Sequence, residues 1–284
     1  IRDSYLLNSE EVVTSMREKL KKANRVVIKI GTSSLVYPNG NINFSSIDEL
    51  AFVLSDLKNQ NKEIILVSSG AIGVGMNKLN IPQRPVEIPQ QQAVAAVGQA
   101  ELMNIYNHRF QVYNQKTAQL LLTRDIIEFP QSRENVCNTL EQLLAMGIIP
   151  IINENDTVAI DELDHLTKFG DNDQLSAIVA QLVHADLLIM LSDIDGFYTA
   201  NPLHHKTAKL YDEITEITPD LMKQATGKGS PYGTGGMSSK LKAADRILKT
   251  DATMILANGK QPKIIFDILA GKKVGTYFYK EETL

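Results

Sequence analysis

Short apolar segments alternate with longer amphipathic segments along most of the chain, and this alternation limits the possible folds more than any other feature of the sequence. The short segments are rich in Val, Ile and Leu and are bounded by polar or turn-forming residues, as buried strands are. We predict strands at residues 25–30, 63–69, 118–123, 147–153, 186–192 and 252–258. Repeated strand–helix–strand order predicts an α/β fold, in which helices cover both faces of a mainly parallel sheet.

The longer segments are predicted to be helices, at residues 9–23, 45–60, 91–110, 133–147 and 237–250 and from Gln174 onward. The 284 residues show no repeat and no flexible linker. We therefore expect one domain over residues 1–284, with a soft boundary near residue 185 and one sheet shared by both halves. Because ligands of parallel sheets bind at the carboxyl ends of the strands, we expect a site in the loops that follow the strands.

Composition argues against several classes of function. Hydrophobic residues make up 43% of the chain, charged residues 22%, and the net charge is −4. Binding to nucleic acid or to a membrane surface draws on massed Lys and Arg, so neither is expected. No apolar run approaches membrane-spanning length and no signal peptide opens the sequence, which predicts a cytoplasmic protein. The single cysteine, Cys137, and the five histidines form no metal or catalytic cluster in the sequence.

The loop after the first predicted strand, "KIGTSS", carries a charge where a charge is costly. Lys29 lies inside an apolar strand, so it is expected either near the strand end or facing a charged ligand. Gly31 permits close backbone approach, and Thr32 and Ser33 supply amides and hydroxyls that suit a phosphate. An equal alternative for so short a motif is a solvated turn with an extended lysine.

Two further loops place glycine or polar residues at strand ends. The segment "SSGAIGVGM" (68–76) is suited to hold a carboxylate or phosphate at a helix start, while Gly73 and Gly75 are equally explained by close helix–strand packing. Its glycine order does not match the dinucleotide fingerprint, which argues against a nicotinamide oxidoreductase. The segment "NEND" (153–156) crowds four polar side chains at the end of a buried strand, more than a simple turn requires.

The last two segments each place residues at a helix start that the helix itself does not require. A helix start needs one short polar side chain as its cap, yet Gly170 is followed by Asp171, Asn172 and Asp173. The glycine-rich segment 227–236 leads into a helix with Lys240 in its first turns, where the helix dipole favours anions instead. A phosphate bound there would resolve the conflict, and a solvated lysine beside a disordered loop is the alternative.

Together these segments identify a known family. In order along residues 24 to 280, "VVIKIGTSSL", "LVSSGAIGVGM", "IINENDTV", "FGDNDQLSA", "LSDIDGFYTANP" and "GTGGMSSKLKAA" resemble the signatures of the amino-acid kinase superfamily, and most closely those of its members that phosphorylate free L-glutamate. The resemblance implies a three-layer αβα sandwich around a mainly parallel sheet. It also implies a substrate half at about 24–185 and a nucleotide-binding half at about 186–284.

The resemblance implies roles for individual residues. Lys29 and Lys240 would stabilise the transferring phosphoryl group, and Asp173 would organise the two lysines. One of residues 171–173 would then cap the helix while Asn172 contacts the substrate. The amino acid would be bound by Ser69, Gly70, Asn153, Asp156 and Asn172. The nucleotide would be bound by Lys29, Gly31, Thr32, Ser33, Ser192, Asp193, Thr234, Gly235, Gly236, Met237 and Lys240.

The implied reaction is ATP-dependent phosphorylation of the γ-carboxylate of L-glutamate, the first step of proline biosynthesis, with Mg²⁺ and without a protein metal cluster. Proline is expected as a feedback inhibitor, touching a flexible acidic segment at 157–168. A dimer or tetramer and a downstream glutamyl phosphate reductase are also implied. Many members carry a carboxy-terminal PUA domain, which is not expected within this chain.

Two alternatives stay open. A related kinase would act on N-acetylglutamate, aspartate, carbamate or a nucleoside monophosphate. A catalytically silent amino-acid or nucleotide sensor would lack turnover, although the two lysines and Asp173 argue against it.

Overall fold

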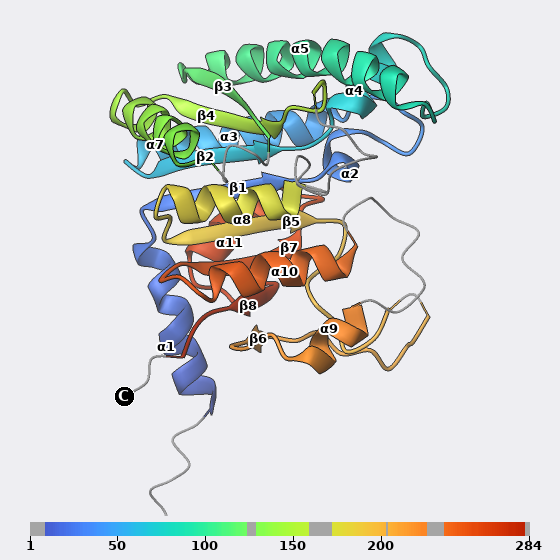
Figure 1. Cartoon of the computed structure of the whole chain (residues 1–284). Coiled ribbons are helices and arrows are strands. Elements are labelled where there is room, and N and C mark those ends of the chain that lie inside the picture. The colour runs from blue at the N-terminus through green and yellow to red at the C-terminus, as the bar shows by residue number, and fades with distance from the viewer. Residues whose placement is uncertain (1–8, 124–128, 159–171, 203, 226–235, 282–284) are drawn as a thin grey trace, which may run out of the picture.

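One eight-stranded sheet runs through the molecule. The computed structural model describes residues 9–123, 129–158, 172–202, 204–225 and 236–281. Within these ranges the strand order is β3-β4-β2-β1-β5-β7-β8-β6 (Figure 1). The strands are β1 Arg25–Ile30, β2 Glu63–Ser68, β3 Thr117–Leu122, β4 Ile149–Glu154, β5 Leu187–Ser192, β6 Glu213–Ile214, β7 Thr253–Asn258 and β8 Thr276–Phe278. The α/β fold predicted from the sequence is confirmed.

The sheet is continuous across the boundary expected near residue 185. β1 pairs in parallel with β2 on one side and with β5 on the other, so both halves share one sheet. All six predicted strands are present within two residues of their expected ends. The prediction missed β6 and β8, because two and three residues are too few for a periodic pattern. β8 runs antiparallel to β7, which makes the sheet mainly rather than wholly parallel.

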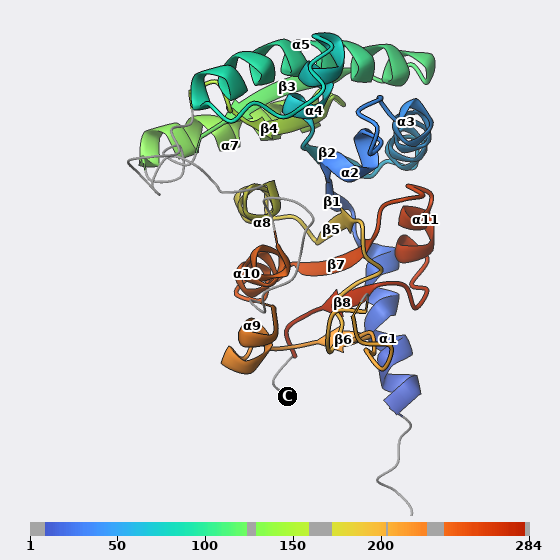
Figure 2. The same cartoon turned by 90° about the vertical axis from the view of Figure 1, so that its right-hand side faces the viewer.

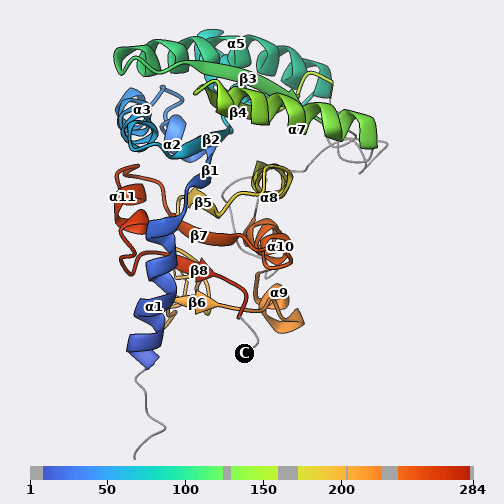
Figure 3. The same cartoon turned by 90° about the vertical axis from the view of Figure 1, so that its left-hand side faces the viewer.

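Helices cover both faces of the sheet. They are α1 Ser9–Lys22, α2 Thr32–Leu35, α3 Phe44–Asn59, α4 Ala71–Lys78, α5 Ile88–Val112, α7 Pro130–Ala145, α8 Asn172–Leu182, α9 Pro219–Ala225, α10 Met237–Ile247 and α11 Ile264–Leu269. Figure 2 shows α8 and α10 on one side of the sheet, and α3 and α11 on the other. α5 lies along the edge formed by β3 (Figure 3). The three layers expected for the fold are therefore present.

Side chains of β1 alternate between the two apolar cores, and this alternation decides where Lys29 points. Val26, Ile28 and Ile30 belong to the core that includes side chains of α3 and α11. Val27 belongs to the opposite core, with side chains of α8 and α10. Because successive strand residues face opposite sides, Lys29 faces the α8 and α10 side with Val27. The buried strand lysine is thereby directed toward the helices that carry Asp173 and Lys240.

Two glycines allow α4 and α5 to pack with their backbones in contact. A Cβ atom on Gly75 would lie 2.1 Å from the carbonyl oxygen of Val94, and one on Gly98 would lie 1.8 Å from that of Ala71. Neither position has room for a side chain, so Gly75 is needed for close packing, but against helix α5 rather than against a strand as predicted. The close contact places the middle of α5 beside the start of α4, which follows the end of β2.

Candidate active site

Asp173 joins two buried lysines from different elements. Its Oδ1 lies 2.5 Å from Lys29 Nζ, and its Oδ2 lies 2.9 Å from Lys240 Nζ. The three residues are only 7%, 1% and 8% exposed for Lys29, Asp173 and Lys240 respectively. The end of β1 and the first turns of α8 and α10 supply them. The structure thus brings together the three residues predicted to be catalytic.

The charges of this triad are unequal. Lys29 and Lys240 each carry one positive charge and Asp173 one negative charge, so the charges of these three residues sum to +1. Burial raises the pKa of the Asp173 carboxyl, but attraction to the Lys29 and Lys240 ammonium groups lowers it more, and the net shift is downward. Because a buried net charge is costly, the triad favours an anion next to it.

Asp173 also accounts for a lysine at an unusual place in a helix. Lys240 stands near the start of α10, where the helix dipole favours anions. In the structure its ammonium group meets the Asp173 carboxylate, so a protein anion already offsets part of the conflict. The phosphate inferred from the sequence is therefore not the only explanation of this lysine.

The first residue of α8, Asn172, is the hub of a buried amide network. Its Nδ2 lies 3.0 Å from the carbonyl oxygen of Ser68, 2.9 Å from Ser69 Oγ and 2.8 Å from Asn153 Oδ1. Asn153 Oδ1 also accepts from the backbone N–H of Glu154 at 2.8 Å. Three of the residues predicted to bind the substrate, Ser69, Asn153 and Asn172, are thus in direct contact.

The amide oxygen of Asn172 is left without a hydrogen-bond partner among the described residues. An unpaired buried acceptor costs about 1–3 kcal/mol, so a donor from a ligand would be favourable here. The structure has α8 from Asn172, two residues before the start predicted at Gln174. Asn172 and Asp173 lie inside the first turn, and Asp171 lies outside the described residues.

Gly70 shapes the same end of the sheet. It precedes α4 with φ of 102°, a left-handed conformation that glycine adopts without strain. Ser69 beside it is half-buried, and its backbone N–H donates to the carbonyl oxygen of Ile30. Asp156 follows β4 in a turn in which the N–H of Val158 donates to the carbonyl oxygen of Asn155. These residues lie at the carboxyl ends of β2 and β4, where the sequence placed them.

The residues predicted to bind the nucleotide gather around neighbouring strand ends. Thr32 and Ser33 begin the short helix α2, and a Cβ on Gly31 would lie 3.6 Å from Lys29 Nζ. Ser192 ends β5 with its hydroxyl 3.1 Å from Asp193 Oδ1. Gly236 and Met237 start α10. Thr234 and Gly235 lie outside the described residues, as does most of the expected flexible segment at 157–168.

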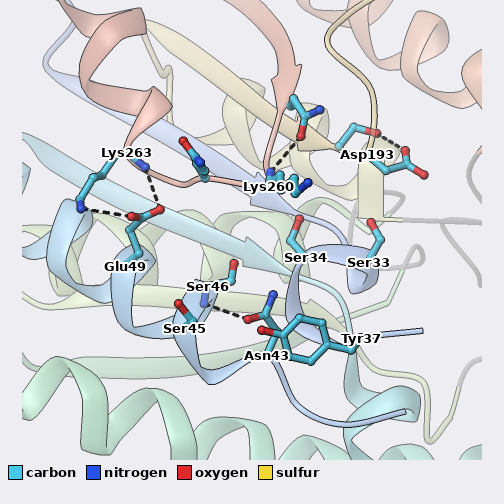
Figure 4. Close-up of a pocket in the computed structure, with 13 residues that line it drawn as sticks. Ser33, Ser34, Tyr37, Asn43, Ser45, Ser46, Glu49, Asp193, Lys260 and Lys263 are labelled. Carbon is cyan, nitrogen blue, oxygen red and sulfur yellow. Dashed lines mark hydrogen bonds and ion pairs between the residues drawn. The ribbon is translucent and has the colours of Figure 1, made fainter. Parts of the chain in front are cut away.

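A pocket of about 680 Å³ opens between the starts of α3 and α11, beside α2 and the ends of β5 and β7. Ser33, Ser192 and Asp193 line it. Figure 4 shows Ser34, Ser46 and Lys260 around the same space. Three of the predicted nucleotide residues, Ser33 on α2 and Ser192 and Asp193 at the end of β5, therefore border one pocket.

Sequence inspection missed some polar residues at this edge of the sheet. Lys260 and Lys263 line the pocket, and the lysine-containing segment "NGKQPK" after a predicted strand was the available signal. Gln99 was missed as well. Its amide oxygen accepts from Asn153 Nδ2 at 2.7 Å, inside an apolar helical segment where a glutamine is unusual.

The described part of the chain shows neither a metal-binding cluster nor a membrane-spanning helix. It contains no group of three or more His, Cys, Asp or Glu side chains placed to hold a metal ion. Among its helices, none has the length and apolar character needed to cross a membrane.

Comparison with known proteins identifies the family of the chain. Residues 24–258 match the model of the amino acid kinase family. Glutamate 5-kinase of Enterococcus faecalis (strain ATCC 700802 / V583) is 72% identical over 265 residues, which cover 93% of this chain and 98% of that protein. Glutamate 5-kinase of Listeria monocytogenes (strain ATCC BAA-679 / EGD-e) is 62% identical over 263 residues, covering 93% and 95%.

Solved structures share the fold at lower identity. Isopentenyl phosphate kinase of T. acidophilum, in a product complex, superposes with a TM-score of 0.60 at 15% identity, over 89% of this chain and 99% of that one. UMP kinase from Bacillus anthracis gives 0.60 at 18%, over 92% and 98%. With the buried triad and the family match over most of its length, the chain belongs to the amino acid kinase family.

Proposed function

We propose that this chain transfers the γ-phosphoryl group of ATP to the γ-carboxylate of L-glutamate, forming L-glutamyl 5-phosphate and ADP, the first step of proline biosynthesis. Relatives 72% and 62% identical over nearly their whole length are glutamate 5-kinases. The observation that carries the proposal is the pair of buried lysines held on one carboxylate. A positive centre at the meeting point of the two halves suits the transfer of a phosphoryl group.

The reaction requires positive charge near the phosphoryl group and alignment of the two substrates more than it requires a general base. A glutamate side chain has a reference pKa of about 4.3, so it is ionised at neutral pH and can attack the γ-phosphorus directly. The bond from its oxygen to phosphorus forms while the bond from phosphorus to the ADP oxygen breaks. Lys29 and Lys240 stabilise the charge on the phosphoryl oxygens. Asp173 binds one lysine with each oxygen and so fixes the spacing of the two ammonium groups.

We propose that glutamate and the nucleotide bind at opposite ends of the site. Glutamate would lie over the first half of the chain, residues 24–185. It would be held there by Ser69, Gly70, Asn153, Asp156 and Asn172. The nucleotide would lie over residues 186–284, against Ser192, Asp193, Gly236 and Met237, with Gly31, Thr32 and Ser33 near its phosphates. Thr234 and Gly235 complete this proposed set.

Mg²⁺ would enter the site bound to the phosphate oxygens of the nucleotide. It usually keeps several waters and phosphate oxygens, and it neutralises phosphate charge. Both Asp173 oxygens face lysines, and the described residues offer no cluster of three metal-binding side chains.

The proposal extends to regulation and context. Proline resembles glutamate in its α-carboxylate and amine, and it would compete at the glutamate end as a feedback inhibitor. The acyl phosphate product hydrolyses readily in water, which suits direct use by a glutamyl phosphate reductase. Assembly as a dimer or tetramer and a cytoplasmic location complete the proposed context.

Hydroxylamine trapping tests the proposal. The protein is incubated with MgATP, hydroxylamine and L-glutamate, L-aspartate, N-acetyl-L-glutamate or carbamate, and the hydroxamate formed from each amino-acid substrate and the ADP released with each acid are measured. We expect hydroxamate from L-glutamate and little from the others. Preference for another acid would assign a related kinase activity, and absence of product with every acid would favour a silent sensor.

A further inference from the structure

Gln99 is a buried glutamine of α5 whose amide oxygen accepts a hydrogen bond from Asn153 on β4. It is 8% exposed. Its neighbour Gly98 lies so close to Ala71 that no side chain fits between them, which fixes α5 against the first turn of α4. α4 begins directly after Ser69 and Gly70. Gln99 is therefore held at the end of the site proposed for glutamate.

Backbone groups determine which way each amide in the network faces. The carbonyl oxygen of Ser68 can only accept, so the group of Asn172 beside it is Nδ2. The backbone N–H of Glu154 can only donate, so the group of Asn153 beside it is Oδ1. Asn153 consequently presents Nδ2 to Gln99, and Gln99 must face it with Oε1.

With the amides oriented in this way, two polar groups of the network remain open to a ligand. Gln99 Nε2 makes no hydrogen bond to any described residue, although the side chain is more than nine-tenths buried. Asn172 Oδ1 is likewise an acceptor with no partner in the described part of the chain. A donor and an acceptor left open by one network match a carboxylate and an ammonium group, the two charged groups of an α-amino acid.

The order of the strands sets the direction of the substrate. Lys29 lies on β1, Ser69 follows β2, and Asn153 lies on β4, one strand further along the sheet, with Gln99 above it on α5. The γ-carboxylate must lie at the lysines, because the phosphoryl group is transferred there. The α-carbon end of glutamate then lies toward β4 and Gln99.

We propose that Gln99 is a further substrate-binding residue, whose Nε2 donates a hydrogen bond to the α-carboxylate of glutamate while Asn172 Oδ1 accepts one from the α-ammonium group. The assignment rests on the proposed function. It makes Gln99 a determinant of specificity for the free α-amino acid head group, at the opposite end of the substrate from the reacting carboxylate.

The substitution Gln99→Glu separates this role from a structural one. The glutamate side chain keeps an oxygen that accepts from Asn153 Nδ2, but it replaces the donor with a negative charge. If Nε2 binds the α-carboxylate, KM for L-glutamate rises by about tenfold or more, while KM for ATP stays within about twofold. A normal KM for glutamate in Gln99→Glu overturns the proposal.

A second ligand identifies the group that Gln99 contacts. 4-Aminobutyrate keeps the amine and the reacting carboxylate of glutamate but lacks the α-carboxylate. Its inhibition constant against L-glutamate should change by less than about twofold in Gln99→Glu, against the tenfold change for glutamate. Equal weakening of both ligands would overturn the proposal, because it would indicate general distortion of the site.

Two further variants complete the test. Gln99→Met keeps the length of the side chain without donor or charge, so it should also raise KM for glutamate, and it serves as the measured variant if Gln99→Glu does not fold. Gln111→Glu makes the same chemical change at an exposed position of α5 and should leave both KM values unchanged. Wild-type protein that forms no hydroxamate from glutamate would refute the proposed function itself, independently of the variants.

Discussion

At the scale of single residues, Asp173 is the centre of the site. It is almost fully buried, and each of its oxygens binds a lysine from a different element. One carboxylate therefore sets the positions of two positive charges, and the excess positive charge suits an anion. Residue types alone indicated that a buried strand lysine and a lysine at a helix start each need a charged partner, for which a ligand was expected. Asp173 as the shared partner was implied only by the family resemblance.

Removing one lysine should mainly slow turnover. In Lys240→Ala we expect kcat to fall by about 10²–10³-fold with a smaller change in KM for glutamate, because the lost charge acts most strongly on the transition state. The measurement is steady-state hydroxamate formation. Lys242→Ala, at an exposed position on the same helix, is the matched control. Near-normal turnover of Lys240→Ala would rule out the assigned role.

Removing the carboxylate should destabilise the protein in a pH-dependent way. Asp173→Asn leaves two buried ammonium groups without their counter-charge, and the free energy of unfolding at pH 7 should fall by about 3 kcal/mol. The folded-state pKa of Asp173 lies below its ordinary value of 3.8, so its stabilisation is present above that pH. It is lost as the pH falls from there through the folded-state pKa.

Urea unfolding of wild type and Asp173→Asn at several pH values measures this effect. The difference between the two proteins should be constant from pH 7 to pH 5 and shrink below pH 3.8. Asp245→Asn, whose carboxylate meets Lys249 near the surface, should cost less than about 1 kcal/mol. A difference that grows on acidification would contradict the account.

At the scale of elements, the position of each side chain follows from strand alternation and helix packing. Lys29 shares the face of Val27 and so meets α8 and α10, while Asn153 at the end of β4 reaches both Asn172 on α8 and Gln99 on α5. The segments that form these elements could be predicted from periodicity. Their partners could not, because the hydrogen bond between Asn153 on β4 and Gln99 on α5 depends on how α5 is placed by its close contacts with α4 at Gly75 and Gly98.

The close contact between α4 and α5 can be tested at Gly98. Gly98→Ala would place a methyl group 1.8 Å from the carbonyl oxygen of Ala71, so the helices must move apart. We expect a loss of about 1–3 kcal/mol in the free energy of unfolding and a higher KM for glutamate, because Gln99 moves with α5. Gln111→Ala on the exposed face of α5 is the control. Unchanged stability in Gly98→Ala would show that the contact is not tight.

At the scale of the whole molecule, one continuous sheet carries both halves of the site. β1 pairs with β2 toward the proposed glutamate side and with β5 toward the proposed nucleotide side. Sequence patterns predicted this shared sheet and its six long strands. They missed β6 and β8, and they placed the start of α8 two residues too late, because a polar first turn resembles a loop.

Shared pairing predicts that the two halves unfold together. Tyrosine fluorescence and far-ultraviolet circular dichroism, followed through a urea titration, should give one coincident transition. The apolar cores on both faces extend across the junction between the halves, so neither half keeps a complete core alone. Two separated transitions would contradict a single cooperative unit.

Attack of the glutamate carboxylate on phosphorus is the central claim, and an isotope measures it most directly. L-Glutamate labelled with ¹⁸O in its γ-carboxylate is incubated with the protein, MgATP and hydroxylamine, and the released phosphate is analysed by mass spectrometry. Hydroxylamine attacks the acyl carbon, so the phosphate leaves with the oxygen that joined it to glutamate. We predict one ¹⁸O-labelled phosphate for each hydroxamate formed. Hydroxamate accompanied only by unlabelled phosphate would show that the carboxylate oxygen never bonded to phosphorus, and the account would be wrong.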